Sequence, residues 1–127
     1  MSVSPELLVY KASAGSGKTF TLAVEYIKLL IQNPRAYQQI LAVTFTNKAT
    51  SEMKERILSQ LYGIWTADKD SAAYLDKVCT ELNMPEAEVR KAAGTALNYM
   101  IHDYSRFRVE TIDSFFQSVM RNLAREL

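Results

Sequence analysis

The chain contains a single cysteine, Cys79, among its 127 residues. A disulfide within the chain needs two cysteines, and no second cysteine is present to help build a metal site. We therefore expect a fold that is stabilised by packing and that carries out no redox chemistry.

Long apolar runs and an excess of charge of either sign are also absent. No stretch approaches the roughly 18 to 20 continuous apolar residues that span a bilayer, and the N-terminus lacks the basic and apolar regions of a secretory signal. Fifteen basic against fourteen acidic side chains give a formal net charge of +1, which predicts no broad field that attracts nucleic acid. We expect a cytoplasmic protein that makes no membrane contact and whose contacts with DNA are local.

Short apolar segments alternate with helical periodicity in the first half of the chain. The composition, 48% hydrophobic and 23% charged, is that of one globular domain or a piece of one. Leu7-Leu8-Val9-Tyr10 and Ile40-Leu41-Ala42-Val43 are typical of buried strands, and a helix is predicted from Thr19 to Asn33-Pro34. A second helix should carry an apolar face formed by Met53, Ile57 and Leu61. This alternation predicts an α/β fold with a parallel sheet.

The second half of the chain begins with a different pattern. Between Thr66 and Arg106 the periodicity is helical, in two segments separated by Asn83-Met84-Pro85. Residues 109–112 are a third strand candidate, and Asp113 or Ser114 is a candidate N-cap of a final helix. We interpret residues 66–106 as a helical insertion within the α/β unit.

The strongest chemical signal lies between the first predicted strand and the first predicted helix. Two glycines there allow backbone N–H groups to turn inward around phosphate oxygens, and the helix N-terminus adds its dipole. Lys18 would contact the β and γ phosphates, and the Thr19 hydroxyl would ligate Mg²⁺. A plainer interpretation is a glycine- and serine-rich turn with an incidental lysine, but the order strand, glycines, Lys-Thr and helix favours phosphate binding. The predicted phosphate-binding residues are Ala12, Ser13, Ala14, Gly15, Ser16, Gly17, Lys18, Thr19 and Phe20, with Lys18 and Thr19 as the catalytic ones.

Three segments together resemble one family. Residues 12–19 resemble the AxAGSGKT form of the phosphate loop in superfamily 1 helicases of the UvrD/Rep type and of the RecB/AddA (exonuclease V beta subunit) type. Residues 40–49, with Glu52-Met53-Lys54-Glu55-Arg56-Ile57, are similar to motif Ia of that family. Residues 109–116 are similar to its third segment, usually Thr-x-His-Ser-Phe, with Asp113 where many relatives have histidine. The order of the segments matches as well.

This resemblance implies a fold and a function. The fold would be a RecA-like P-loop domain, three-layered around a parallel sheet, and residues 1–127 would be its partial N-terminal portion. The parent protein would be an ATP-dependent DNA helicase or translocase, with 3′ to 5′ polarity, a role in DNA repair or recombination, and RecB-like nuclease activity as an option. Its cofactors would be ATP and Mg²⁺, and its partners single-stranded DNA and the remainder of the helicase chain.

The resemblance also implies DNA contacts beyond the carboxyl ends of the strands, where parallel sheets present binding groups. Thr44, Phe45, Thr46 and Asn47 would form one contact, in which the phenylalanine ring offers a stacking face to any base, and Thr111 and Ser114 would form another. Simpler structural roles are also open. Phe45 could fill the core, Thr44 and Thr46 could cap a helix, Asn47 could be the N-cap with Thr50 or Ser51 assisting, and the charges at 52–56 are most simply a solvated helix face.

Several parts of a helicase motor are missing from the sequence. A motor needs a carboxylate pair on a later strand and arginines from a second motor domain, and the glutamine-containing adenine motif is absent too. We therefore expect a fragment without ATP turnover whose uncovered sheet edge and apolar faces favour self-association. The alternatives are a self-contained P-loop protein or nucleotide kinase, and a helical interaction scaffold with a vestigial loop.

Overall fold

The computed structural model of the protein describes residues 6–9 and 17–126, with side chains from Thr19 onwards. The residues of the predicted phosphate loop from 12 to 16, and the Lys18 side chain, lie outside the described part. The elements, in chain order, are β1 (Glu6–Val9), α1 (Gly17–Gln32), β2 (Ile40–Thr44), α2 (Asn47–Thr66), α3 (Ala72–Leu82), α4 (Glu86–His102), β3 (Val109–Thr111) and α5 (Ile112–Glu126). Short 3₁₀ turns at Ala36–Gln39, Lys69–Ser71 and Tyr104–Arg106 connect them.

The sheet is parallel and has three strands in the order β1-β2-β3. Leu8 is paired with Ala42, and Ala42 in turn with Val109. The predicted α/β class, the parallel sheet and all three predicted strands are confirmed, with differences of one residue at their ends. Because the strands are parallel, their carboxyl ends meet at one edge of the sheet.

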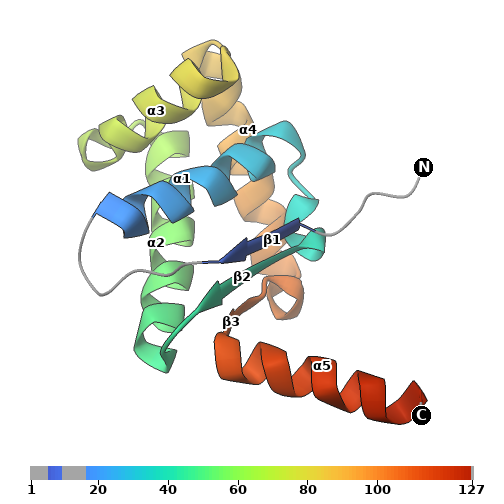
Figure 1. Ribbon diagram of the computed structural model, residues 1–127. Helices are drawn as coiled ribbons and strands as arrows, with labels where there is room; N and C mark the ends of the chain where they lie inside the picture. Colours follow the sequence, from blue (N-terminus) through green and yellow to red (C-terminus); the bar gives the residue numbers. More distant parts are fainter. Residues whose placement is uncertain (1–5, 10–16, 127) are drawn as a thin grey trace.

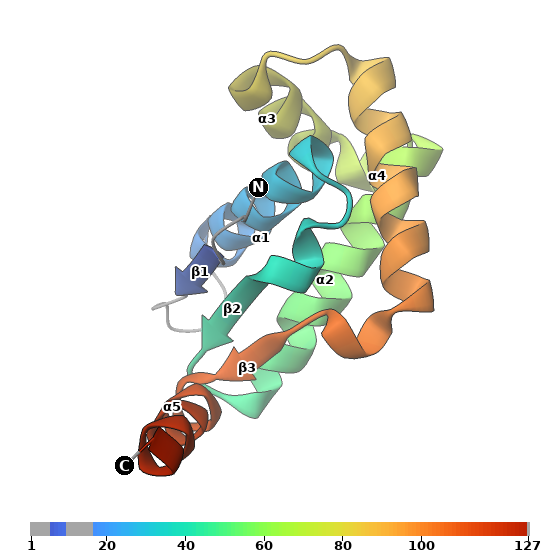
Figure 2. The same cartoon turned by 90° about the vertical axis from the view of Figure 1, so that its right-hand side faces the viewer.

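The hydrophobic core lies between the sheet and the helices that cover one of its faces. Figure 2 shows α1, α2 and α4 on the same side of the strands. Each helix supplies an apolar stripe at helical spacing, as the sequence predicts for α1 and α2. The fully buried residues of these stripes include Tyr26, Ile27 and Leu30 of α1, Ile57, Leu61 and Ile64 of α2, and Ala93, Ala96 and Met100 of α4.

The helical middle of the chain forms α3 and α4, as predicted, and α3 lies beside α1 (Figure 1). Near the start of both helices the Phe20 and Tyr74 rings pack with centroids 4.6 Å apart. Near their ends the Lys28 ammonium group lies 2.7 Å from a Glu81 carboxylate oxygen. The two contacts join residues 54 and 53 positions apart (74 − 20 and 81 − 28), so α3 runs parallel to α1.

Helix α5 begins earlier than the sequence suggests. Its N-cap is Thr111, whose hydroxyl oxygen accepts a hydrogen bond from the Ser114 backbone N–H at 3.2 Å. The prediction that Asp113 or Ser114 caps this helix is wrong, because both residues lie within its first turn. The strand β3 therefore passes into α5 with no loop between them, and α5 projects from the end of the sheet (Figure 1).

No helix in the described part of the chain has both the length and the apolar character needed to cross a membrane.

Candidate functional site

Two of the segments that carry the family resemblance lie at one edge of the sheet, and the elements that flank the third begin and end there. Strand β1 ends at Val9 and α1 begins at Gly17, so the predicted phosphate loop connects these two elements. Strand β2 ends at Thr44, which is paired with Thr111 at the end of β3. The candidate site is therefore the carboxyl edge of a parallel sheet, which is where such sheets bind ligands.

The first turn of α1 supplies the described part of the predicted phosphate site. Gly17 opens the helix, and the side chains of Thr19 and Phe20 follow it, both half-buried. A helix N-terminus offers unpaired N–H groups and a partial positive charge to an anion. The Phe20 ring packs against Tyr74 rather than facing solvent, so its described contact is a packing contact.

The loop between β2 and α2 is held in shape by threonines. Thr44 is buried, its hydroxyl donates to the Thr46 carbonyl oxygen at 3.2 Å, and it also lies 2.6 Å from the Thr50 hydroxyl oxygen. Thr46 is the N-cap of α2 and accepts from the Ala49 backbone N–H at 3.0 Å. The predicted capping role of Thr46 is confirmed. Asn47 is not the N-cap, because it is the first residue of the helix itself.

This loop leaves Phe45 pointing away from the core. The residue is 50% exposed, so the interpretation of Phe45 as core filling is wrong. Thr46 and Asn47 are exposed as well. An aromatic ring flanked by small polar groups, fixed by a capped helix behind it, has the chemistry to stack on a base and hydrogen-bond a phosphate.

The segment from β3 to α5 lies next to that loop. The Thr111 hydroxyl is used to cap α5, and Ser114 provides the N–H that it accepts, while the Ser114 side chain is exposed. Asp113 is exposed in the first turn of α5, where a carboxylate is favoured by the helix dipole. The structure thus brings Thr111 and Ser114 to the same edge as Phe45.

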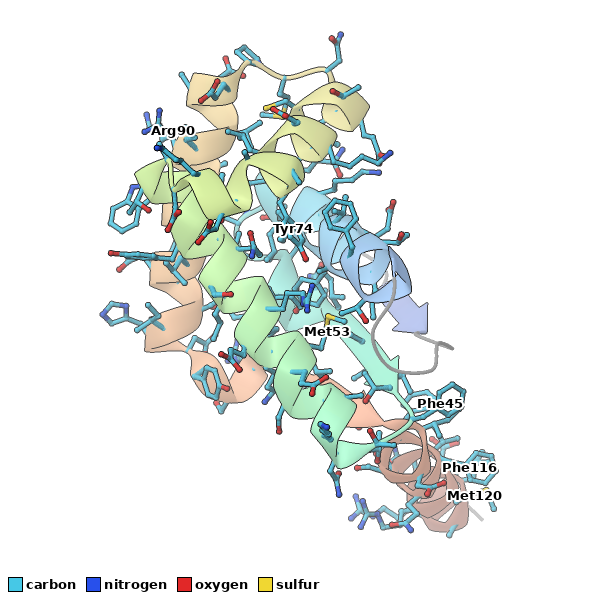
Figure 3. The ribbon with its side chains drawn as sticks, turned by 90° about the vertical axis from the view of Figure 1, so that its left-hand side faces the viewer. Phe45, Met53, Tyr74, Arg90, Phe116 and Met120 are labelled. Atoms are coloured by element: carbon cyan, nitrogen blue, oxygen red, sulfur yellow. The ribbon has the colours of Figure 1, made fainter. Side chains whose placement is uncertain are left out.

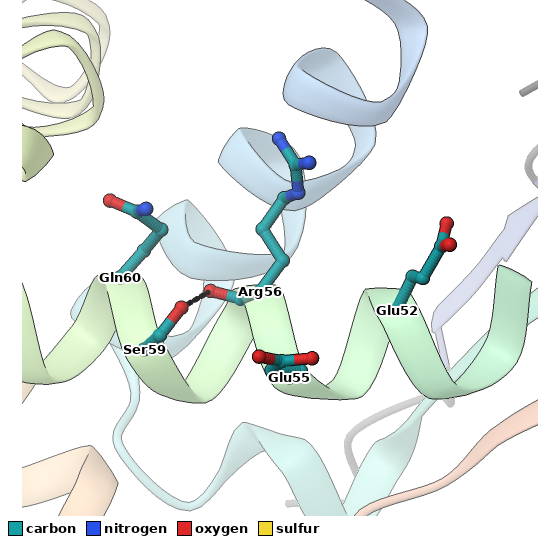
Figure 4. Close-up of a pocket in the computed structure, with 5 residues that line it drawn as sticks. All are labelled: Glu52, Glu55, Arg56, Ser59 and Gln60. Atoms are coloured by element: carbon teal, nitrogen blue, oxygen red, sulfur yellow. Dashed lines mark hydrogen bonds between the residues drawn. The ribbon is translucent and has the colours of Figure 1, made fainter. Parts of the chain in front are cut away.

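A polar pocket of about 330 Å³ lies on α2 and is lined by Glu52, Glu55, Arg56, Ser59 and Gln60 (Figure 4). The Arg56 side chain extends from α2 towards α1 in that view. Its Nη1 atom donates to the Tyr74 hydroxyl at 3.1 Å, and Tyr74 lies where α1, α2 and α3 meet (Figure 3). The charges at 52–56 are therefore not only a solvated face, as the sequence pattern alone indicates.

Sequence reasoning misses this link between the pocket and α1. The pattern places Arg56 only in a motif and on a charged face, and Tyr74 only in a helical stripe. The Tyr74 ring packs on Phe20, one residue after Thr19, while its hydroxyl accepts from Arg56. No local pattern signals a contact between residues 18 and 54 positions apart, so only the fold could reveal it.

Within the described part of the chain no group of three or more His, Cys, Asp or Glu side chains could hold a metal ion. The Mg²⁺ ion of a phosphate loop needs no such group, since one Thr hydroxyl, phosphate oxygens and water complete its shell. Thr19, in the first turn of α1, is in the right element for that role.

The chain is similar to known helicases along nearly its whole length. Residues 2–127 match the family of the UvrD/REP helicase N-terminal domain. The ATP-dependent DNA helicase UvrD1 of Mycobacterium leprae is 37% identical over 100 residues, which cover 79% of this chain and 12% of that protein. The RecBCD enzyme subunit RecB of Haemophilus influenzae is 30% identical over 124 residues, which cover 80% of this chain and 10% of that one.

A shorter and stronger similarity falls on a helicase–nuclease. In the ATP-dependent helicase/nuclease of Clostridium novyi, one subunit is 54% identical over 52 residues, which cover 39% of this chain and 4% of that protein. No solved structure matches the chain significantly. The chain spans between 4% and 12% of the length of these three relatives. With nearly every residue matched, the chain belongs to the UvrD/REP helicase N-terminal domain family.

Proposed function

We propose that this chain is the ATP-binding, DNA-contacting part of an ATP-dependent DNA helicase or translocase of the UvrD/RecB kind. The observation that carries the proposal lies at the carboxyl edge of one parallel sheet, where β1 ends before the predicted phosphate loop and residues 44–47 lie next to residues 111–114. The relatives' names, which include a DNA helicase and a helicase/nuclease, support the same interpretation.

The nucleotide would bind at the first turn of α1. Residues 12–17 would surround the phosphates with backbone N–H groups, Lys18 would neutralise the β and γ phosphates, and Thr19 would ligate Mg²⁺. ATP with Mg²⁺ supplies the free energy for movement along DNA when bound. The protein's own part would be to bind the phosphates and to couple their presence to the conformation of the adjoining loops.

Single-stranded DNA would cross the loop between β2 and α2. The exposed Phe45 ring would stack on a base, and Thr46, Asn47, Thr111 and Ser114 would contact the sugar-phosphate backbone. Thr44 would contribute by holding the loop, since its buried hydroxyl is already hydrogen-bonded. Because the contacts are few and the net charge is +1, binding would be weak and without sequence preference.

Hydrolysis would need groups that the sequence does not contain, namely the carboxylate pair and the arginines of a second motor domain. The chain would then hold ATP without turning it over. In this proposal residues 1–127 form part of a RecA-like domain in the cytoplasm, residues 66–106 are an insertion, and a further layer covers the other face of the sheet. The parent would move 3′ to 5′ and serve repair or recombination, with a nuclease domain as a variant of the same scheme.

The test is to titrate the chain with Mg²⁺-ATP and, separately, with oligothymidylate, and to follow phosphate release throughout. We expect Lys18→Ala to abolish nucleotide binding, and Phe45→Ala to weaken DNA binding by about 1–3 kcal/mol, the contribution of one stacked base. Tyr62→Ala removes a different exposed aromatic ring, which lies on α2, and should leave both affinities unchanged.

Two outcomes would contradict the proposal. Steady phosphate release by the purified chain would favour a self-contained P-loop enzyme. Nucleotide binding and stability that are both unaffected by Lys18→Ala would favour a helical scaffold with a vestigial loop.

A further inference from the structure

We propose that Tyr74, in the helical middle of the chain, is a positioning residue of the nucleotide site: it holds the Arg56 guanidinium beside the first turn of α1 for contact with bound nucleoside triphosphate. This inference rests on the proposed function. It assigns α3 a part in nucleotide binding that the motifs of the family resemblance do not include.

Tyr74 contacts both sides of the site. Its ring packs on Phe20, which follows Thr19 in the first turn of α1, with centroids 4.6 Å apart. Its hydroxyl oxygen accepts a hydrogen bond from Arg56 Nη1 of α2 at 3.1 Å. Only 5% of Tyr74 is exposed, so the ring is fixed by packing and its hydroxyl has a defined position.

Arg56 carries a charge that the described residues do not neutralise. A guanidinium group has five N–H donors, and in the described part of the chain Tyr74 is its hydrogen-bond partner. Glu52 and Glu55 line the same pocket, yet neither forms an ion pair with Arg56 among the described residues. The remaining donors are available to an anionic ligand, and the pocket leaves space for one beside the Arg56 side chain, which extends towards α1.

The tyrosine hydroxyl matters because an arginine side chain is flexible. An arginine side chain loses rotamer entropy when it is fixed in one conformation. A hydrogen bond to a buried, immobile acceptor fixes the arginine side chain before the ligand binds, which raises affinity by preorganisation. Tyr74→Phe should therefore weaken nucleotide binding while leaving the ring packing on Phe20 intact.

Helix α3 is itself held against α1 by an ion-pair network. The Lys28 ammonium group lies 2.7 Å from Glu81 and 3.2 Å from Glu25, and Lys77 lies 2.9 Å from Glu81. The position of Tyr74 is thus tied to the helix that begins at the phosphate loop. Movement of α3 relative to α1 would displace Arg56 from the site, so the helical middle and the nucleotide are coupled through Tyr74.

The experiment is a double-mutant cycle on Mg²⁺-ATP affinity, with the wild type, Tyr74→Phe, Arg56→Gln and the double variant. We expect Tyr74→Phe to weaken binding about 3- to 10-fold, the effect of one net hydrogen bond, and Arg56→Gln to weaken it at least as much. The double variant should bind like Arg56→Gln alone, because the hydroxyl acts only through the guanidinium. Thermal midpoints of all variants serve as the measure of folding.

The matched control is a second arginine–tyrosine pair. Arg35 lies beyond the other end of α1, with its Nη2 atom 3.5 Å from the Tyr99 hydroxyl and its guanidinium carbon 4.7 Å from the centre of that ring. Tyr99→Phe should leave Mg²⁺-ATP affinity unchanged.

The outcomes separate the inference from the proposed function. If Lys18→Ala abolishes binding but Tyr74→Phe has no effect, or if Tyr74→Phe and Arg56→Gln are additive, the inference is overturned and the proposed function stands. If the wild type does not bind Mg²⁺-ATP, or if Lys18→Ala binds it normally, the proposed function falls and the inference falls with it.

Discussion

Helices α1 and α5 have nearly the same length, 16 and 15 residues, and each follows a strand of the parallel sheet, but they use their apolar faces in opposite ways. Tyr26, Ile27 and Leu30 of α1 are wholly buried beneath the sheet. Phe116, Met120 and Leu123 of α5 are 62%, 52% and 55% exposed, and Figure 3 shows Phe116 and Met120 on the outer side of that helix. Periodicity specifies that a helix has an apolar face, whereas the neighbouring elements decide whether the face is buried.

The exposed face of α5 is wider than a scatter of single residues. Ile112, Phe116, Val119 and Leu123 are spaced by four, three and four positions, and Met120 widens the stripe. A contiguous apolar patch of this kind on a soluble protein favours association. It gives the predicted self-association of the chain a specific location, which the comparison with α1 makes testable.

The largest expected effect on stability comes from shortening a buried side chain on the apolar face of α1. Ile27→Ala should lower the free energy of unfolding by about 2–5 kcal/mol, because it removes buried methyl groups and leaves a cavity. Met120→Ala on α5 should change it by less than about 0.5 kcal/mol, because that side chain is half-exposed. Urea unfolding followed by circular dichroism measures both values, and equal losses would mean that α5 is packed in solution.

Gly63 of α2 and Gly94 of α4 extend the comparison to two other helices. A Cβ atom at Gly63 would lie 1.9 Å from the Ser71 hydroxyl oxygen and 2.8 Å from its Cβ atom, and Ser71 is buried. Gly63→Ala should therefore destabilise the protein by about 1–3 kcal/mol, the usual cost of overpacking. At Gly94 the added atom would meet the Trp65 ring at 2.5 Å.

Trp65 is half-exposed, which makes Gly94→Ala the matched control. Its ring can move towards solvent, so the loss of stability should be smaller than for Gly63→Ala. Thermal unfolding of both variants tests the difference. A larger loss at Gly94 would show that Trp65 is held in place and that exposure does not predict tolerance here.

Some parts of the fold and of the candidate site can be predicted from the sequence, and others cannot. Apolar periodicity locates every strand and helix to within a few residues, and the glycine-lysine-threonine motif predicts the nucleotide site, because both signals are local. The cap of α5 is misplaced because Thr111 and Asp113 are both good N-caps, and only the backbone geometry chooses between them. The contacts of Tyr74 with Phe20 and Arg56 depend on how distant helices pack, which no local pattern encodes.

A smaller effect on stability, but a clear one on association, is expected from a charge on the α5 face. Phe116→Asp should reduce self-association while changing the free energy of unfolding by less than about 0.5 kcal/mol, since the residue is already 62% exposed. Gln117→Asp adds the same charge at the next, exposed position of the same helix and should leave association unchanged. Sedimentation equilibrium measures both, and a wild type that is monomeric at high concentration would remove the basis of this prediction.

The smallest expected effect concerns the ion pairs that hold α3 against α1. Hydrogen bonds from Lys28, and then from Lys77, lower the pKa of Glu81 in the folded chain. A carboxyl group whose folded pKa lies below its unfolded value contributes stability above the unfolded value, and loses it as the pH falls through the folded pKa. The contribution of Glu81 should therefore be complete at neutral pH and decline below about pH 4.5, the ordinary pKa of a glutamate.

In Glu81→Gln the free energy of unfolding should be lower at neutral pH, and its decline in acid should be shallower than in the wild type. Glu126→Gln removes a carboxylate at the exposed end of α5. Its free energy of unfolding should change with pH as that of the wild type does, because α5 has no such ion pair to lose among the described residues. If that of Glu81→Gln also changes with pH as in the wild type, the helical middle is held to α1 by the packing of Tyr74 on Phe20 and not by charge.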